Sequence, residues 1–133
     1  MSDTSIAGAL IAKAIRAGES ANLLLADGDI DGACDRAYYA MFNAARAALL
    51  AANVGITQDI GKTHSGLISA FGLQLVKTGR IPNEFGKSLN RAEEIRLIAD
   101  YKGDSVEFVD ANELVLQADR FVETMRSIFF PQH

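Results

Sequence analysis

The chain has 133 residues and a formal net charge of −4, from 17 Asp and Glu against 13 Lys and Arg. This length suffices for one hydrophobic core, and the acidic balance disfavours a protein that coats nucleic acid by bulk electrostatic attraction. The one cysteine, Cys34, excludes an internal disulfide and a cysteine-only zinc site. We therefore expect a single soluble domain over residues 1–133 in a reducing cytoplasm, without an export signal or a membrane span.

Apolar and alanine residues recur at three- and four-residue steps through most of the chain, without the alternation that is typical of strands. The first such stretch predicts a helix over about residues 6–26, followed by a turn at residues 27–32. The second predicts a helix over about residues 31–53 with an alanine-rich face, and Cys34 and Tyr38 lie beside that face. Such small side chains allow a neighbouring helix to approach closely.

Three more helices are expected in the rest of the chain. The third begins at Thr63, and the fourth takes Pro82 into its first turn and runs to about Asp100. Asp110 and Glu113 form a D-x-x-E capping pattern for the last helix. Four long helices and one shorter helix, joined by short connections, predict an all-α, up-and-down antiparallel bundle.

Arg96 falls in the middle of the apolar stripe of the fourth helix, where a guanidinium group needs carboxylate partners. Glu93, three residues earlier, and Asp100, four residues later, are the nearest acidic residues on the same helix. Two interpretations stay open. Arg96 forms either a structural ion pair that fixes helix register or part of a polar site at a subunit seam or cleft.

Two further groups of polar residues are candidates for binding. His64 lies at a helix start, where an imidazole can bind an anion together with backbone N–H groups, or can simply cap and pack. Tyr39, Asn43, Arg36 and Arg46 lie on the side of the second helix away from its alanines. That strip is either a surface for a nucleotide or RNA, or a solvated or subunit-contacting face. One internal histidine makes no metal site, so we expect no metal and no cofactor.

Three stretches together resemble the HEPN domains of bacteria and archaea: RAYYAMFNAARAALL at 36–50, KTHSGLISAFG at 62–72 and LNRAEEIRLIADY at 89–101. The resemblance extends from about Ala21 to Phe129. It implies a bundle of four or five helices, often a homodimer, frequently encoded beside a minimal nucleotidyltransferase as a two-component or toxin–antitoxin pair. Ribonuclease members carry a polar residue, an arginine and, four to six residues after the arginine, a histidine, with the site assembled from two subunits.

The ribonuclease pattern is incomplete in this chain. Asn90 and Arg91 supply the polar residue and the arginine, but Arg96 stands five positions later, and Asp100 and Tyr101 follow Arg96 without a histidine. An aspartate paired with an arginine is a poor general base at neutral pH. We therefore expect a homodimeric binding or regulatory subunit that partners a minimal nucleotidyltransferase, with a nucleotide or RNA as a candidate ligand.

The residues expected to contact a ligand or partner are Arg96, Asp100, Tyr101, Asn90, Arg91, His64, Tyr39 and Asn43. Two alternatives remain. One is a metal-independent endoribonuclease toxin that uses Arg91, Arg96, Asp100 and Tyr101 across a dimer. The other is a purely structural dimerisation module, which would bind neither nucleotide nor RNA.

Overall fold

The structure is a computed structural model that describes residues 2–53, 63–101 and 106–131. Its described residues form five α-helices and one short π-helical segment, η1, and contain no strand. The elements are α1 (Ser2–Ala26), α2 (Ile30–Ala52), α3 (His64–Phe71), η1 (Gly72–Val76), α4 (Asn83–Tyr101) and α5 (Phe108–Phe129). The predicted all-α bundle of four long helices and a shorter one is confirmed, whereas the expectation that residues 1–133 form a single domain stays a prediction.

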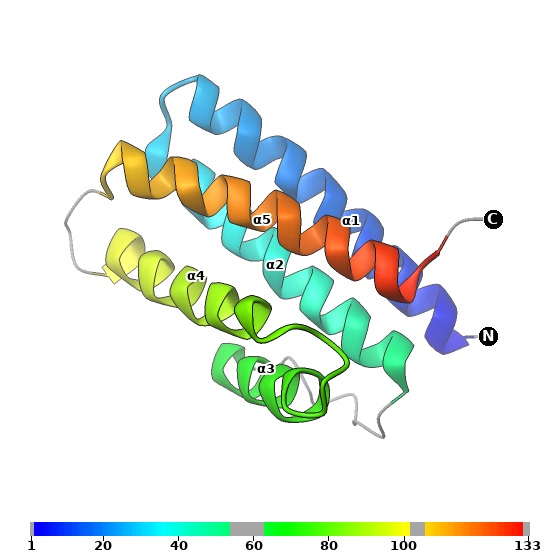
Figure 1. The fold of residues 1–133 in the computed structure, drawn as a ribbon. Coiled ribbons are helices and arrows are strands. Elements are labelled where there is room, and N and C mark those ends of the chain that lie inside the picture. Colours follow the sequence, from blue (N-terminus) through cyan, green and yellow to red (C-terminus); the bar gives the residue numbers. More distant parts are fainter. Residues whose placement is uncertain (1, 54–62, 102–105, 132–133) are drawn as a thin grey trace.

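The second helix, α2, occupies the centre of the bundle and packs against α1, α3, α4 and α5. Figure 1 shows α1 and α5 side by side along one part of α2, while α4 and the short α3 lie beside another part of it. The first residues of α1 and the last residues of α5 lie at the same end of the bundle (Figure 1). None of the described helices is long and apolar enough to cross a membrane.

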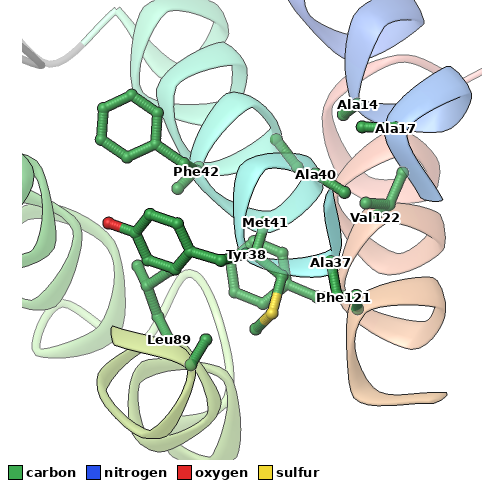
Figure 2. Close-up of a cluster of buried hydrophobic side chains, with 14 of the residues drawn as sticks. Ala14, Ala17, Ala37, Tyr38, Ala40, Met41, Phe42, Leu89, Phe121 and Val122 are labelled. Atoms are coloured by element: carbon green, nitrogen blue, oxygen red, sulfur yellow. The ribbon is translucent and has the colours of Figure 1, made fainter. Parts of the chain in front are cut away.

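The alanines of α2 explain how so many helices fit around it. Ala37 and Ala40 are completely buried, and Figure 2 shows Ala40 on the side of α2 toward Ala14 and Ala17 of α1, while Ala37 lies next to Phe121 of α5. Small side chains on both helices shorten the distance at which their backbones pack. The larger core side chains therefore lie on the other sides of α2, and they include Tyr38, Met41, Leu49, Leu89 and Phe121.

Two caps fix the starts of helices that matter for the site. The Thr63 side chain accepts a hydrogen bond from the backbone N–H of Gly66 at 3.0 Å, which confirms Thr63 as the start of α3. Asp29 caps α2 in the same way, accepting from the N–H of Gly32 at 2.9 Å. The expected turn at residues 27–32 is therefore too long, because α2 already begins at Ile30.

The predicted capping pattern of the last helix is wrong. The helix α5 begins at Phe108, so Asp110 lies inside its first turn, and the residue at the cap position, Glu107, makes no side-chain hydrogen bond there. The incorrect prediction of the cap has a physical cause. Phe108 and Val109 are apolar but exposed, so their side chains give no core-facing signal that the helix has already started.

Candidate functional site at the junction of α2, α3 and α4

Arg96 on α4 is held by both of the carboxylates that the spacing predicted. Its Nε and Nη2 atoms lie 3.0 Å from Oε1 of Glu93, and Nη1 lies 3.0 Å from Oδ2 of Asp100. The side chain of Arg96 is only 14% exposed, compared with 20% for Glu93 and 37% for Asp100. A guanidinium group with this little exposure needs such partners, because an uncompensated buried charge is costly.

Tyr38 joins this ion-pair group to the centre of the bundle. The guanidinium carbon of Arg96 lies 5.1 Å from the centroid of the Tyr38 ring, a cation–π contact. Burial raises the pKa of the Tyr38 hydroxyl far above its ordinary value, and the charge of Glu93 raises it further, while Arg96 acts in the opposite direction. Tyr38 is therefore a neutral phenol throughout the physiological pH range.

His64, the first residue of α3, completes the group through Tyr38. Its Nδ1 atom lies 2.7 Å from the Tyr38 hydroxyl oxygen. Its ring packs nearly parallel to that of Tyr38, with 5.2 Å between centroids, and 4.9 Å from the centroid of Phe42. Figure 2 shows the Tyr38 hydroxyl directed away from α1 and α5. We call Tyr38, His64, Glu93, Arg96 and Asp100 the Arg96 cluster.

The other predicted residues of α4 lie outside the Arg96 cluster. Asn90 is exposed and donates from its side-chain amide to the backbone carbonyl of Gly86 at 3.1 Å. Arg91 is exposed and lies 3.8 Å from Glu94, a loose surface pair. Tyr101 is the last residue of α4, and its side chain lies outside the part of the structure that is described.

The polar strip of α2 is only partly a solvated face. Tyr39 is 44% exposed, and the guanidinium group of Arg36 lies 4.7 Å from the centroid of its ring. Asn43, in contrast, is 3% exposed, and its Nδ2 atom is buried without a hydrogen-bond partner, as is Nε of Arg36. The interpretation of this strip as a solvated face therefore does not apply to Asn43.

A groove of about 300 Å³ separates α4 from α5. Ile95 and Leu114 are buried apolar residues in its wall, and Arg91 lies at its edge. Arg120 of α5 and Glu84 of α4 are joined across the two helices by an exposed ion pair of 3.1 Å. The polar residues that line the groove are Glu84, Lys87, Ser88, Arg91, Asp110, Glu113 and Gln117.

Neither the Arg96 cluster nor the groove between α4 and α5 brings together a set of metal-ligating side chains. Within residues 2–53, 63–101 and 106–131, no three side chains of His, Cys, Asp or Glu lie close enough together to hold a metal ion.

Comparison with known proteins identifies the family. The HEPN domain family matches residues 7–128, a range that contains the whole Arg96 cluster. The chain belongs to the HEPN domain family. This result confirms the resemblance inferred from the three sequence stretches.

Relatives of this HEPN chain include two UPF0332 proteins. The protein of Gloeobacter violaceus is 39% identical over 107 residues, covering 79% of this chain and 81% of the relative. The protein of Thermotoga maritima is 35% identical over 112 residues, covering 83% and 80%. A Methanocaldococcus jannaschii protein named as a candidate toxin is 34% identical over 91 residues, covering 68% of this chain and 64% of the relative. This HEPN protein is thus related to proteins that carry the name of toxins.

Sequence reasoning found Arg96, Glu93 and Asp100 but did not assign Tyr38 to the site, and it left the position of His64 relative to Arg96 open. The signal for Tyr38 was its place beside the alanine face of α2, where a large polar side chain is unusual. A buried hydroxyl requires a hydrogen-bond partner, and that requirement pointed to a polar neighbour without identifying it.

Proposed function

We propose that this HEPN chain is a homodimeric binding or regulatory subunit of a two-component pair whose other member is a minimal nucleotidyltransferase. The family match and the relatives named as toxins support the pair. The observation that favours binding over catalysis is the state of the Arg96 cluster. Arg96 already has two carboxylate partners at 3.0 Å, so its guanidinium group and both carboxylates are engaged with one another in an ion-pair group.

The proposed homodimer uses the exposed side of α2 together with α4. Arg36 and Arg46 form no ion pair with any described carboxylate, whereas the Arg96 cluster contains two carboxylates and one guanidinium group. A two-fold axis would bring the basic strip of one copy to the acidic side of the other. Light scattering on the purified protein measures this directly. A monomer at micromolar concentration would contradict the homodimer.

The pair is tested with the protein encoded in the neighbouring reading frame where that protein is a minimal nucleotidyltransferase. We expect the two chains to co-purify as a complex of defined stoichiometry when they are expressed together. A nucleotide or RNA is proposed as the ligand of the HEPN subunit, and a bound ligand must raise its melting temperature when the ligand is in large excess over its dissociation constant. No shift with either ligand would favour the structural dimerisation module.

The second candidate function is a metal-independent endoribonuclease. The observation that favours it is the position of His64, which brings an imidazole to the Arg96 cluster although no histidine follows Arg91 or Arg96 by four to six residues. Cleavage of a labelled RNA by the purified chain in the presence of a chelator, abolished by Arg96→Ala, would establish this function. Intact RNA after incubation with the unmodified chain is the result that the proposed binding subunit requires.

A further inference from the structure

The groove between α4 and α5 has walls of opposite charge. Lys87 and Arg91 lie on its α4 side, and Asp110 and Glu113 lie on its α5 side. In the described part of the chain, neither of the two cations forms an ion pair with Asp110 or Glu113, and the carboxylate that pairs with Arg91 is Glu94 of its own helix, at 3.8 Å. Because the charges of the two walls do not neutralise each other across the groove, both are available to an occupant.

The floor of the groove is apolar and closed. Ile95 of α4 and Leu114 of α5 are buried, and the side chain of Ser88 donates a hydrogen bond to Oε1 of Gln117 across the two helices, at 3.3 Å. Both helices also pack against α2 (Figure 1). An occupant of the groove therefore lies on the two helices and does not enter the core.

The groove is long in the direction of the helices. It adjoins a smaller recess of about 130 Å³ that shares Arg91, Ile95 and Asp110 with it and extends to Ile98. From Glu84 to Ile98 the α4 side covers about four helical turns, or roughly 20 Å. This length suits a third helix that lies along α4 and α5 better than it suits a compact small molecule.

The α5 rim of the groove carries exposed apolar residues. Val109 stands four residues before Glu113 and Leu116 three residues after it, so all three lie on one face of α5. Both apolar side chains are exposed. A ligand inside the groove would leave them uncovered, whereas a helix that lies over the groove and its rim would cover them. Exposed apolar residues beside a groove are typical of a surface that binds another protein.

We propose that this groove binds an amphipathic helix of another protein. The apolar residues of that helix lie over Ile95 and Leu114, its acidic residues face Lys87 and Arg91, and its basic residues face the α5 wall. The carboxylates of the α5 wall disfavour an RNA backbone in the same place, because they repel phosphate. The inference goes beyond the two-component pair proposed above and does not depend on it.

The groove lies on a different side of α4 from the Arg96 cluster. Arg91 and Arg96 are five positions apart, which corresponds to about 140° around the helix axis. The homodimer proposed above uses the side of Arg96, so it leaves the groove open. One chain can therefore bind a second copy and the amphipathic helix at the same time.

Three synthetic peptides test the charge pattern on the full-length protein. Each is a stabilised helix of about 16 residues with the same apolar stripe. The first has Glu on one flank and Lys on the other, the second has Glu on both flanks, and the third has Lys on both. We expect fluorescence anisotropy to show that the first peptide binds at least about tenfold more tightly than the other two, because each of those places like charges against one wall.

Reversal of one wall should change which peptide is preferred. The double variant Lys87→Glu, Arg91→Glu makes both walls acidic, so the peptide with Lys on both flanks should now bind most tightly. Arg16→Glu, a charge reversal at an exposed position of α1, is the control and should leave the preference unchanged. Circular dichroism checks that both variants keep their helices.

The apolar rim is tested with a matched pair of variants. Val109 of α5 is 71% exposed and Leu23 of α1 is 72% exposed. We expect Val109→Ser to weaken binding of the first peptide about fivefold and Leu23→Ser to leave it unchanged.

Four results would overturn the proposal. They are absence of binding by all three peptides, equal binding of all three, equal effects of Val109→Ser and Leu23→Ser, and conversion of a dimer to a monomer by Val109→Ser. The last result would assign the groove to a second copy of this chain. Co-purification with the nucleotidyltransferase is a separate measurement, so it decides the proposed pair independently.

Discussion

Two arginines of α4, five positions apart, differ sharply although their local sequences are alike. Arg91 and Arg96 each have a glutamate three residues away, Glu94 and Glu93 respectively. Arg96 is 14% exposed with its glutamate at 3.0 Å, whereas Arg91 is 58% exposed with its glutamate at 3.8 Å. The difference comes from the neighbouring helix. Tyr38 of α2 lies against Arg96, while Arg91 lies at the edge of a groove.

The comparison shows that helical spacing supplies the ion-pair partner, whereas tertiary packing decides how much the pair contributes to stability. An exposed pair such as that of Arg91 contributes little, because both ions remain solvated. The Arg96 pair is shielded from water on the side of Tyr38, so each of its members depends more strongly on the others.

Replacement of Arg96 by Met should have the largest effect on stability. Arg96→Met leaves Glu93 and Asp100 as adjacent unpaired carboxylates, and we expect the free energy of unfolding to fall by about 3 kcal/mol. The matched variant Arg91→Met should change it by less than about 0.5 kcal/mol. Chemical denaturation of both variants measures the difference. Equal effects would show that Arg96 is a surface residue like Arg91.

Replacement of one carboxylate partner tests the same difference between Arg96 and Arg91. Asp100→Asn removes the more exposed of the two partners, so Arg96 keeps Glu93, and we expect a loss of about 1 to 2 kcal/mol. Glu94→Gln, which removes the partner of Arg91, should cost less than about 0.5 kcal/mol. If Asp100→Asn is also neutral while it weakens ligand or partner binding, the cluster is a functional site rather than a structural ion pair.

Loss of the Thr63 cap tests whether the start of α3 positions His64. Thr63→Ala removes the hydrogen bond to Gly66, and we expect a destabilisation of about 1 kcal/mol. The His64 ring signals should broaden in the same variant because the first turn of α3 is less ordered. Thr63→Ser keeps the hydroxyl group and is the control. Unchanged His64 signals in Thr63→Ala would mean that packing against Tyr38 alone holds the ring.

Cys34 supplies a contrasting case, a buried ionisable group without a salt-bridge partner. Burial raises the pKa of its thiol to about 11, and the nearby Asp31, Asp110 and Asp35 add to the rise. The folded protein therefore favours the neutral thiol. Its contribution to stability is complete below the unfolded value of 9.0 and declines as the pH rises from there towards about 11.

The same burial predicts slow chemistry at Cys34. In the native state we expect labelling by a thiol reagent at pH 8 to be much slower than in denaturant, because the thiolate is the reactive form and the side chain is completely buried. Stopped labelling reactions analysed by mass spectrometry measure both rates. Rapid labelling of the folded chain would contradict the placement of Cys34 in the core.

The helices could be predicted from the sequence because their apolar residues recur at helical spacing over many turns. The ends were harder. The α2 start at Ile30 depends on the Asp29 cap, and the π-helical turn after α3 shows in the hydrogen bond from the Lys77 N–H to the Gly72 carbonyl, 2.8 Å long. Such local choices leave little trace in hydrophobic periodicity.

In the candidate site, too, contacts within one helix were predictable from the sequence, whereas contacts between helices were not. Glu93 and Asp100 were predictable as partners of Arg96 because all three lie on one helix. The contact between Tyr38 and His64 joins residues 26 positions apart, and it depends on how α3 packs against α2. The burial of Asn43 is also a tertiary effect, since its helical position alone places it on the outer side of α2.

The central position of α2 has a consequence for how this bundle opens. Each of the other four α-helices packs against α2, so a helix that detaches uncovers part of α2 as well as its own apolar face. Partial unfolding therefore exposes surface on two elements at once, which makes partly unfolded states costly. The alanine-rich helix acts as the common element through which the stability of α1 and α5 and that of α3 and α4 depend on each other.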